Sequence, residues 1–151
     1  MKVAIISGSV YGTAEEVARH AESLLKAAGH EAWHAARATL QDVEGFAPEA
    51  LLAVTSTTGM GELPDNLMPL YSMIRDTLPA AWRGLPGAVI ALGDSSYGDT
   101  YCGGGEQMRE LFAELGVHEV QPMLRLDASE TVTPETDAEP WLASFAQALN
   151  G

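Results

Sequence analysis

The chain has 151 residues, 46% of them hydrophobic, and a net charge of −13 from 8 Lys and Arg against 21 Asp and Glu. This composition predicts a single globular domain over residues 1–151 with a sizeable core, and no apolar stretch is long enough to span a bilayer. The negative charge repels phosphate backbones and argues against nucleic acid as a partner. We expect no membrane partner either.

The N-terminus and the cysteine content point to the cytoplasm as the default location. Residues 1–6 run directly into Gly8 and Ser9, which is too short for a secretory signal and typical of a first strand. The only cysteine, Cys102, excludes an intramolecular disulfide and offers no cysteine zinc site. We expect a monomer without a metal site.

The first half of the chain predicts two strands, each followed by a helix. The strands are Lys2–Ser7 and Glu31–His34, and a short helix is expected within Ala38–Phe46. A longer helix separates the two strands and ends at Gly29, a favourable residue beyond a helix C-terminus. Its apolar stripe at helical spacing is Ala14, Val17, Ala18, Ala21, Leu24, Leu25 and Ala28.

The second half continues the alternation. Strands are predicted at Leu51–Thr55, at Gly87–Leu92 and, less regularly, within His118–Leu126. Pro64 is expected at the first position of a helix, and Gly116 is expected to stop the next one. The inward-facing residues of the three helices are Leu67, Leu70, Tyr71, Ile74 and Leu78; Met108, Leu111, Phe112 and Leu115; and, within Glu135–Leu149, Trp141, Leu142, Phe145 and Leu149.

Five strands with interleaved helices predict an α/β fold. Helices between successive strands favour a parallel sheet covered on both faces. The expected architecture is a doubly wound sheet of order 2-1-3-4-5 in three layers.

Three loops rich in Gly, Ser and Thr follow the first, third and fourth strands. They are residues 7–14, 56–62 and 92–103. Open α/β sheets bind ligands at the carboxyl ends of their strands. The three loops therefore predict one ligand site.

The first loop has the properties of a phosphate cradle. Gly8 and Gly12 allow tight turns, and Ser9, Tyr11 and Thr13 add hydroxyl donors beside the amides that open a helix. The loop contains no Lys or Arg, so backbone and hydroxyl groups would bind the phosphate without a side-chain cation. An ordinary glycine-containing turn explains this loop alone equally well.

The sequence does not carry the motifs of NTPases, dinucleotide-binding proteins or phospho-acceptor receivers. The sequence lacks G-x-x-x-x-G-K-[ST] and G-x-G-x-x-G, and no acidic residue ends the second strand to bind a dinucleotide ribose. A phospho-acceptor receiver needs an aspartate after the third strand, where Ser56 stands.

Taken together, the loops resemble those of one family. Residues 8–16, 56–66 and 93–103 resemble the three FMN-binding loops of flavodoxins and of the FMN domains of diflavin reductases. The resemblance covers essentially the whole chain. The short length, the Ser-Thr-x-Gly-x-Gly element and Pro64-Asp65-Asn66 are similar to short-chain flavodoxins of the MioC type.

The resemblance implies a flavodoxin-like fold with FMN as its cofactor. The first loop would hold the FMN phosphate, Tyr97 would stack on the isoalloxazine ring, and the Gly59 carbonyl would face flavin N5. Asp94 and Cys102 would border the pyrimidine end. The expected cofactor-binding residues are Ser9, Val10, Tyr11, Gly12, Thr13, Ala14, Thr57, Thr58, Gly59, Met60, Gly61, Gly93, Asp94, Tyr97 and Cys102.

Three positions depart from the family pattern, one of them Ala14, where true flavodoxins usually have Thr. Tyr11 stands where Thr or Ser is usual, and Thr58 stands where many flavodoxins place a second stacking aromatic residue. The ring would therefore have one aromatic neighbour.

The expected function is that of an electron carrier without a catalytic residue of its own. It would shuttle single electrons from a flavodoxin reductase with a basic face to an acceptor redox enzyme, and Glu62, Asp65, Asp94 and Asp99 would supply a negative face. Two alternatives remain open: an FMN-dependent quinone or nitro reductase, and an interaction module that has lost its flavin.

Overall fold

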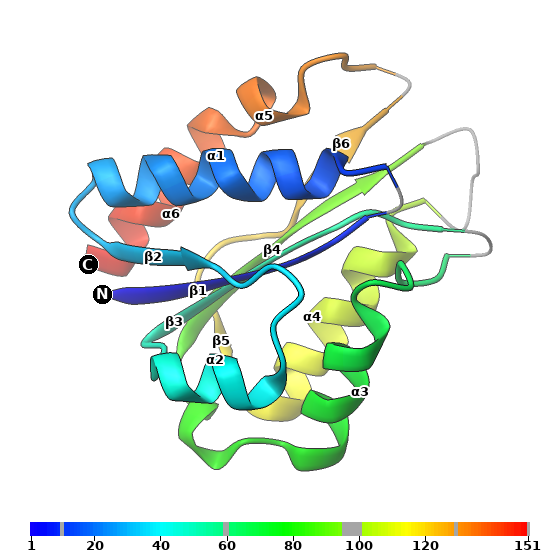
Figure 1. The fold of residues 1–151 in the computed structure, drawn as a ribbon. Helices are drawn as coiled ribbons and strands as arrows, with labels where there is room; N and C mark the ends of the chain where they lie inside the picture. Colours follow the sequence, from blue (N-terminus) through cyan, green and yellow to red (C-terminus); the bar gives the residue numbers. More distant parts are fainter. Residues whose placement is uncertain (10, 59–60, 95–100, 129, 151) are drawn as a thin grey trace.

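The computed structural model describes residues 1–9, 11–58, 61–94, 101–128 and 130–150. Strands and helices alternate along the chain (Figure 1). Their bounds are β1 Lys2–Gly8, α1 Thr13–Ala27, β2 Glu31–His34, α2 Leu40–Phe46, β3 Ala50–Thr55, α3 Met68–Thr77, η1 Ala80–Trp82, β4 Pro86–Gly93, α4 Gly103–Leu115, β5 His118–Glu119, β6 Leu124–Asp127, α5 Pro134–Asp137 and α6 Glu139–Asn150.

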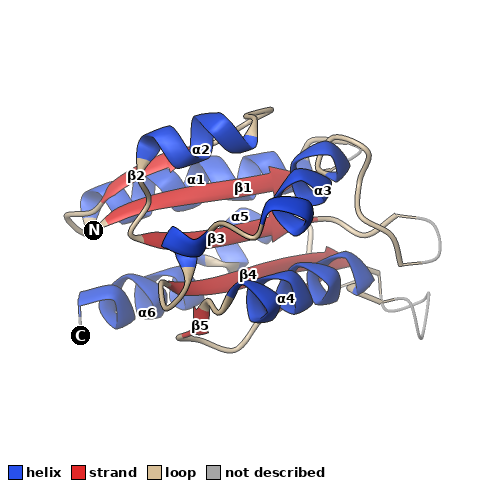
Figure 2. Ribbon diagram, turned by 90° about the horizontal axis from the view of Figure 1, so that it is seen from below, coloured by secondary structure: helices blue, strands red, loops and turns tan. Residues whose placement is uncertain are grey.

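The predicted sheet order is confirmed. The strands run parallel in the order β2-β1-β3-β4, and both β5 and β6 pair with β4 at the fifth position. Helices α1, α5 and α6 cover one face, and α2, α3 and α4 cover the other (Figures 1 and 2). Every residue of β3 is buried, as expected for a strand covered on both sides.

The core accordingly has two halves, one on each face of the sheet. Alternate residues of β1 divide between them: Val3 and Ile5 pack with α1 and α6, whereas Ala4 and Ile6 pack with α2, α3 and α4. Residues of α1 that reach the sheet are mostly alanines, which let the helix lie close to the strands.

Two predicted segments are interrupted. The fifth strand is split into β5 and β6, with Pro122 between them, because proline has no N–H to donate to the sheet. The last helix is split at Ala138 because Pro140 cannot donate to a carbonyl one turn earlier.

The helix predicted to open at Pro64 begins at Met68, so that prediction was wrong. Pro64 is buried in the preceding turn, and its carbonyl accepts from the amide of Leu67 at 3.0 Å. Pro69 occupies the first turn of α3 instead. Leu78, expected to face inward, is the C-cap residue with φ 46° and is 46% exposed.

The approach of α4 to the sheet requires glycine at position 105. A Cβ there would lie 2.3 Å from Cβ of Ala91 and 3.0 Å from Sδ of Met123. No side chain fits this space without moving the helix or the strand.

We predict that Gly105→Ala lowers the free energy of unfolding by ~1–3 kcal/mol, because it overpacks the interface of α4 with β4. Gly45→Ala in α2 is the matched control, since a Cβ there meets nothing within 4 Å. The control should raise stability by ~0.5–1 kcal/mol. Urea unfolding measures both; equal stability of Gly105→Ala and the parent would contradict this packing.

His34 joins the edge strand β2 to its neighbour. Its Nε2 lies 2.6 Å from Oγ of Ser7 at the end of β1. Burial lowers the pKa of His34, although the charge of Glu22 acts in the opposite direction. The folded state therefore favours the neutral ring.

A lowered pKa means that the folded chain binds fewer protons at this site than the unfolded chain. The stabilisation is present above the ordinary value of 6.5 and is lost as the pH falls through the folded-state pKa. We predict that the free energy of unfolding falls less steeply in His34→Gln than in the parent between pH 7 and about 5.5. His118→Gln, on an exposed residue of β5, is the control.

Candidate functional site

The three predicted loops meet at one edge of the sheet. Gly8 at the end of β1 is level with Thr55 at the end of β3, and Thr55 is level with Ala91, two residues before β4 ends. In Figure 2 the arrowheads of β1, β3 and β4 point to this common edge. The parallel register therefore brings distant parts of the chain together.

The first loop leads into α1 through Gly12. This residue is the N-cap of α1 with φ 87°, a left-handed conformation that favours glycine, and no side chain caps the helix. A Cβ on Gly12 would meet nothing within 4 Å, so the space beside it is open. Uncapped amides that face open space fit a phosphate group.

The carboxylate of Glu15 holds the first loop in place through a hydrogen bond from Ser9. Oγ of Ser9, which is buried, donates to Glu15 and accepts from the amide of Gly12 at 2.9 Å. Glu15 lies in the first turn of α1, where its negative charge complements the helix N-terminus. In the structure it also fixes the hydroxyl group at the start of the loop.

Asn66 connects this first loop to the second. Its Oδ1 accepts from the amide of Ser9 at 3.0 Å, and its Nδ2 donates to Glu15 at 2.9 Å. Asn66 belongs to the Pro64-Asp65-Asn66 element, and the sequence predicts no role for its side chain. Nothing in its local pattern predicts a contact with residues more than fifty positions away.

The second loop turns back on itself and packs against α4. Thr58 and Glu62 form an antiparallel bridge, and Oγ1 of Thr58 donates to the carbonyl of Glu62 at 3.3 Å. Oγ1 of Thr57 accepts from the amide of Gly104 at 3.1 Å. Gln107, which the sequence analysis missed, donates to the carbonyl of Gly61 at 2.8 Å. The helix therefore holds this loop at both ends.

The glycines that open α4 make this contact possible. A Cβ on Gly103 would lie 2.7 Å from the carbonyl oxygen of Gly61, and one on Gly104 would lie 2.4 Å from that of Ser56. The second and third loops are thus in direct backbone contact.

Cys102 closes the third loop on the end of β4. It is fully buried with φ 57°, and a Cβ on Gly93 would lie 2.8 Å from its amide nitrogen. Burial raises the pKa of the Cys102 thiol, and burial raises that of Tyr101 to about 12. Both side chains stay protonated at neutral pH, and the thiol points into the protein.

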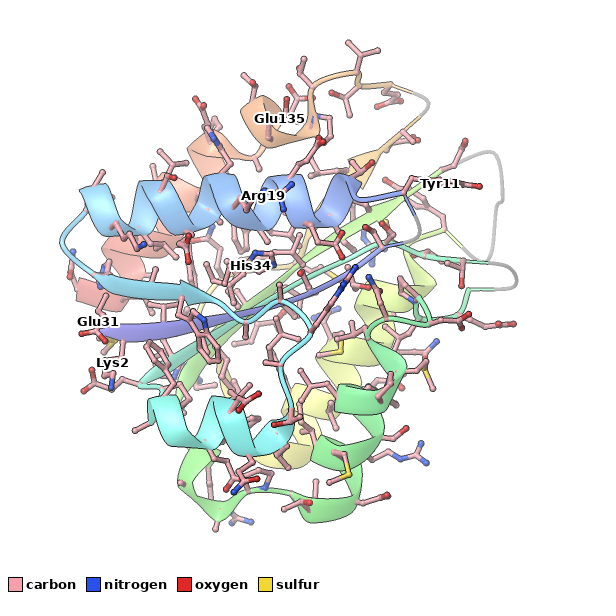
Figure 3. All side chains as sticks on the ribbon, in the orientation of Figure 1. Lys2, Tyr11, Arg19, Glu31, His34 and Glu135 are labelled. Carbon is pink, nitrogen blue, oxygen red and sulfur yellow. The ribbon has the colours of Figure 1, made fainter. Side chains whose placement is uncertain are left out.

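The structure describes some of the remaining predicted cofactor-binding residues and not others. Thr13 and Ala14 form the first turn of α1, and Asp94 follows β4 directly. The side chain of Tyr11 is 93% exposed and points away from the body of the molecule (Figure 3). Four of the predicted cofactor-binding residues lie outside the described part of the chain: Val10, Gly59, Met60 and Tyr97. So does Asp99, which was expected to contribute to the negative face.

Two arginines from outside the first loop lie beside it. Arg19 of α1 and Arg37 after β2 line a cavity of about 340 Å³ together with Ser9 and Gly12 of the loop. The first loop has no cation in its own sequence, but two arginines from other elements lie beside it.

No helix in the described ranges has the length and apolar character needed to traverse a bilayer.

Comparison with known proteins identifies the family. The flavodoxin family model matches residues 5–141. Flavodoxin YqcA of Escherichia coli is 40% identical over 99% of both chains, and a MioC homologue of Haemophilus influenzae is 34% identical over 99% of both. The solved structure of a mutant flavodoxin from Pseudomonas aeruginosa is 78% identical, covers 100% of both chains and superposes with a TM-score of 0.97.

These matches confirm the expected resemblance to short-chain flavodoxins of the MioC type and agree with FMN as the expected cofactor. The chain belongs to the flavodoxin family.

Proposed function

We propose that this chain is an electron carrier that holds one FMN and moves single electrons from a reductase to an acceptor enzyme in the cytoplasm. The observation that carries the proposal is the meeting of three loops at one sheet edge in a chain of the flavodoxin family. When bound, FMN supplies the redox chemistry, and the protein supplies binding, orientation and electrostatics.

The loops divide the task of binding. The amides that open α1 hold the phosphate, where Gly12 leaves open space, and Ser9 shapes the loop through its hydrogen bonds to Gly12 and Glu15. The second and third loops border the ring system, and their mutual contact through Gly104 and Gln107 keeps them at a defined spacing. A site built from prearranged loops binds at lower entropic cost.

Acidic residues in the second loop favour a basic partner. Glu62 and Asp65 are both exposed, in a chain with a net charge of −13. Complementary charge accelerates encounter, and salt screens this attraction over ~8–10 Å. We expect reduction by a basic reductase to be limited by such steering.

We predict that stopped-flow reduction of the FMN-loaded protein by a flavodoxin reductase slows steeply as ionic strength rises, mainly through the association rate. Glu62→Gln with Asp65→Asn should slow reduction at low salt and flatten the salt curve while leaving FMN affinity unchanged.

The matched control is Glu44→Gln with Glu114→Gln, an equal charge change on exposed residues near the ends of α2 and α4. Equal effects of the two pairs would show that only net charge matters. Rapid oxidation of NADPH by the protein and a quinone alone would identify a reductase instead of a carrier. A purified chain whose visible spectrum is unchanged by added FMN would identify a flavin-free module.

Tyr97 is proposed as the main ring-stacking residue, since Thr58 offers no aromatic face. We predict that Tyr97→Ala weakens FMN affinity by ~1–3 kcal/mol, as expected for the loss of a buried aromatic contact. Tyr97→Phe keeps the ring and should bind FMN like the parent in fluorescence titrations. An alanine variant with parental affinity would place the stacking elsewhere.

A further inference from the structure

A cavity lies behind the first loop, on the side of the edge strand β2. It is bordered by the end of β1, by α1 and by the segment that follows β2, and its volume is about 340 Å³. The lining residues are Ser7, Ser9, Gly12, Glu15, Arg19, Ala36, Arg37 and Asn66.

This cavity concentrates positive charge in an acidic protein. The chain has 8 Lys and Arg, and two of them, Arg19 and Arg37, line this one cavity. Within the described ranges neither has a carboxylate within 4.0 Å, whereas Lys2, Arg109 and Arg125 all form ion pairs. Both guanidinium groups are therefore available to an anion.

The neutral lining groups are held in place by hydrogen bonds, with Ser9 donating its amide to Asn66 and its hydroxyl to Glu15, so the two arginines supply the donors for an anion. Ser7 and Ser9 are buried, and the hydroxyl of Ser7 is held 2.6 Å from Nε2 of His34. Figure 3 shows that Arg19 on α1 and His34 on β2 come from neighbouring elements on the same side of the molecule.

One carboxylate, Glu15, lines the cavity, and each of its two oxygens already accepts a hydrogen bond. It accepts hydrogen bonds from Ser9 and from Asn66. Two arginines against one hydrogen-bonded carboxylate leave an excess of positive charge.

The backbone at Arg37 supports a specific role. Arg37 has φ 54°, a left-handed conformation that non-glycine residues adopt rarely. Such conformations persist where the surroundings impose them, and they are frequent at ligand sites. The backbone after β2 therefore has an unusual conformation at Arg37, the residue that lines the cavity.

We propose that this arginine cavity binds an anion of the phosphate class, with Arg19 and Arg37 as its cations. Bidentate guanidinium groups match the geometry of phosphate oxygens. The anion has two possible sources: the phosphate of FMN itself, since Ser9 and Gly12 belong to both loop and cavity, or a phosphate of a second ligand. Only the first source rests on the proposed function.

The first arm of the test compares FMN with riboflavin, which lacks the phosphate. Fluorescence titrations of the flavin-free protein, in buffer without phosphate or sulfate, use Arg19→Gln and Arg37→Gln. If FMN is the source, each variant binds FMN about tenfold more weakly and riboflavin within about twofold of the parent. Arg75→Gln on α3 is the control, an exposed arginine with no ion pair in the described ranges.

The second arm adds inorganic pyrophosphate to the FMN-loaded protein and follows binding by calorimetry. If a second ligand is the source, binding is saturable in the parent and in Arg75→Gln and is lost in Arg19→Gln and Arg37→Gln. A measurement that needs no variant is modification by phenylglyoxal: FMN or pyrophosphate should protect Arg19 and Arg37, but not Arg75, as read by mass spectrometry.

The proposal is overturned if neither arm separates Arg19 and Arg37 from Arg75 and neither ligand protects the two arginines. A parent chain that binds neither FMN nor riboflavin would instead refute the proposed function. The pyrophosphate and protection measurements on the flavin-free protein would still decide the arginine cavity.

Discussion

The structure depends on the burial of a parallel sheet from both sides. β3 is buried along its whole length, and β1 and β4 are exposed only at their ends. Backbone groups within these strands can be satisfied only by neighbouring strands, and the parallel register brings the ends of β1, β3 and β4 to the same edge. Polar loops must follow at that edge, because there the chain leaves the core. The position of the ligand site is thus a consequence of how the core is packed.

Close backbone contacts then turn three separate loops into one site. Glycines 103 and 104 bring the start of α4 against the second loop, and Gln107 holds the carbonyl of Gly61. Asn66 and Glu15 join the second loop to the first. A change in one loop is therefore transmitted to the others by direct contact.

In the proposed function the charge distribution would serve two different purposes. A net charge of −13 gives the molecule a long-range negative field, which suits brief association with a basic partner. The same field opposes the binding of a phosphate dianion. Arg19 and Arg37 offset it locally beside the first loop, whose own residues supply only neutral donors. The net charge of the molecule is therefore negative, whereas the charge beside the first loop, where an anion is expected, is positive.

Most strands and helices, the sheet order and the family could be predicted from the sequence, because burial imposes short periodic patterns and the three loops carry recognisable residues at fixed spacing. The prediction from sequence misplaced the start of α3 at Pro64 and joined β5 to β6, since proline has more than one local solution and only the surrounding packing selects among them. The folded structure was needed to show that Asn66 accepts from the amide of Ser9, that Gln107 donates to the carbonyl of Gly61, and that Arg37 shares a cavity with Arg19. Each of these contacts joins residues from different elements, which come within reach of each other only when the sheet has folded. No local sequence pattern predicts such a pair.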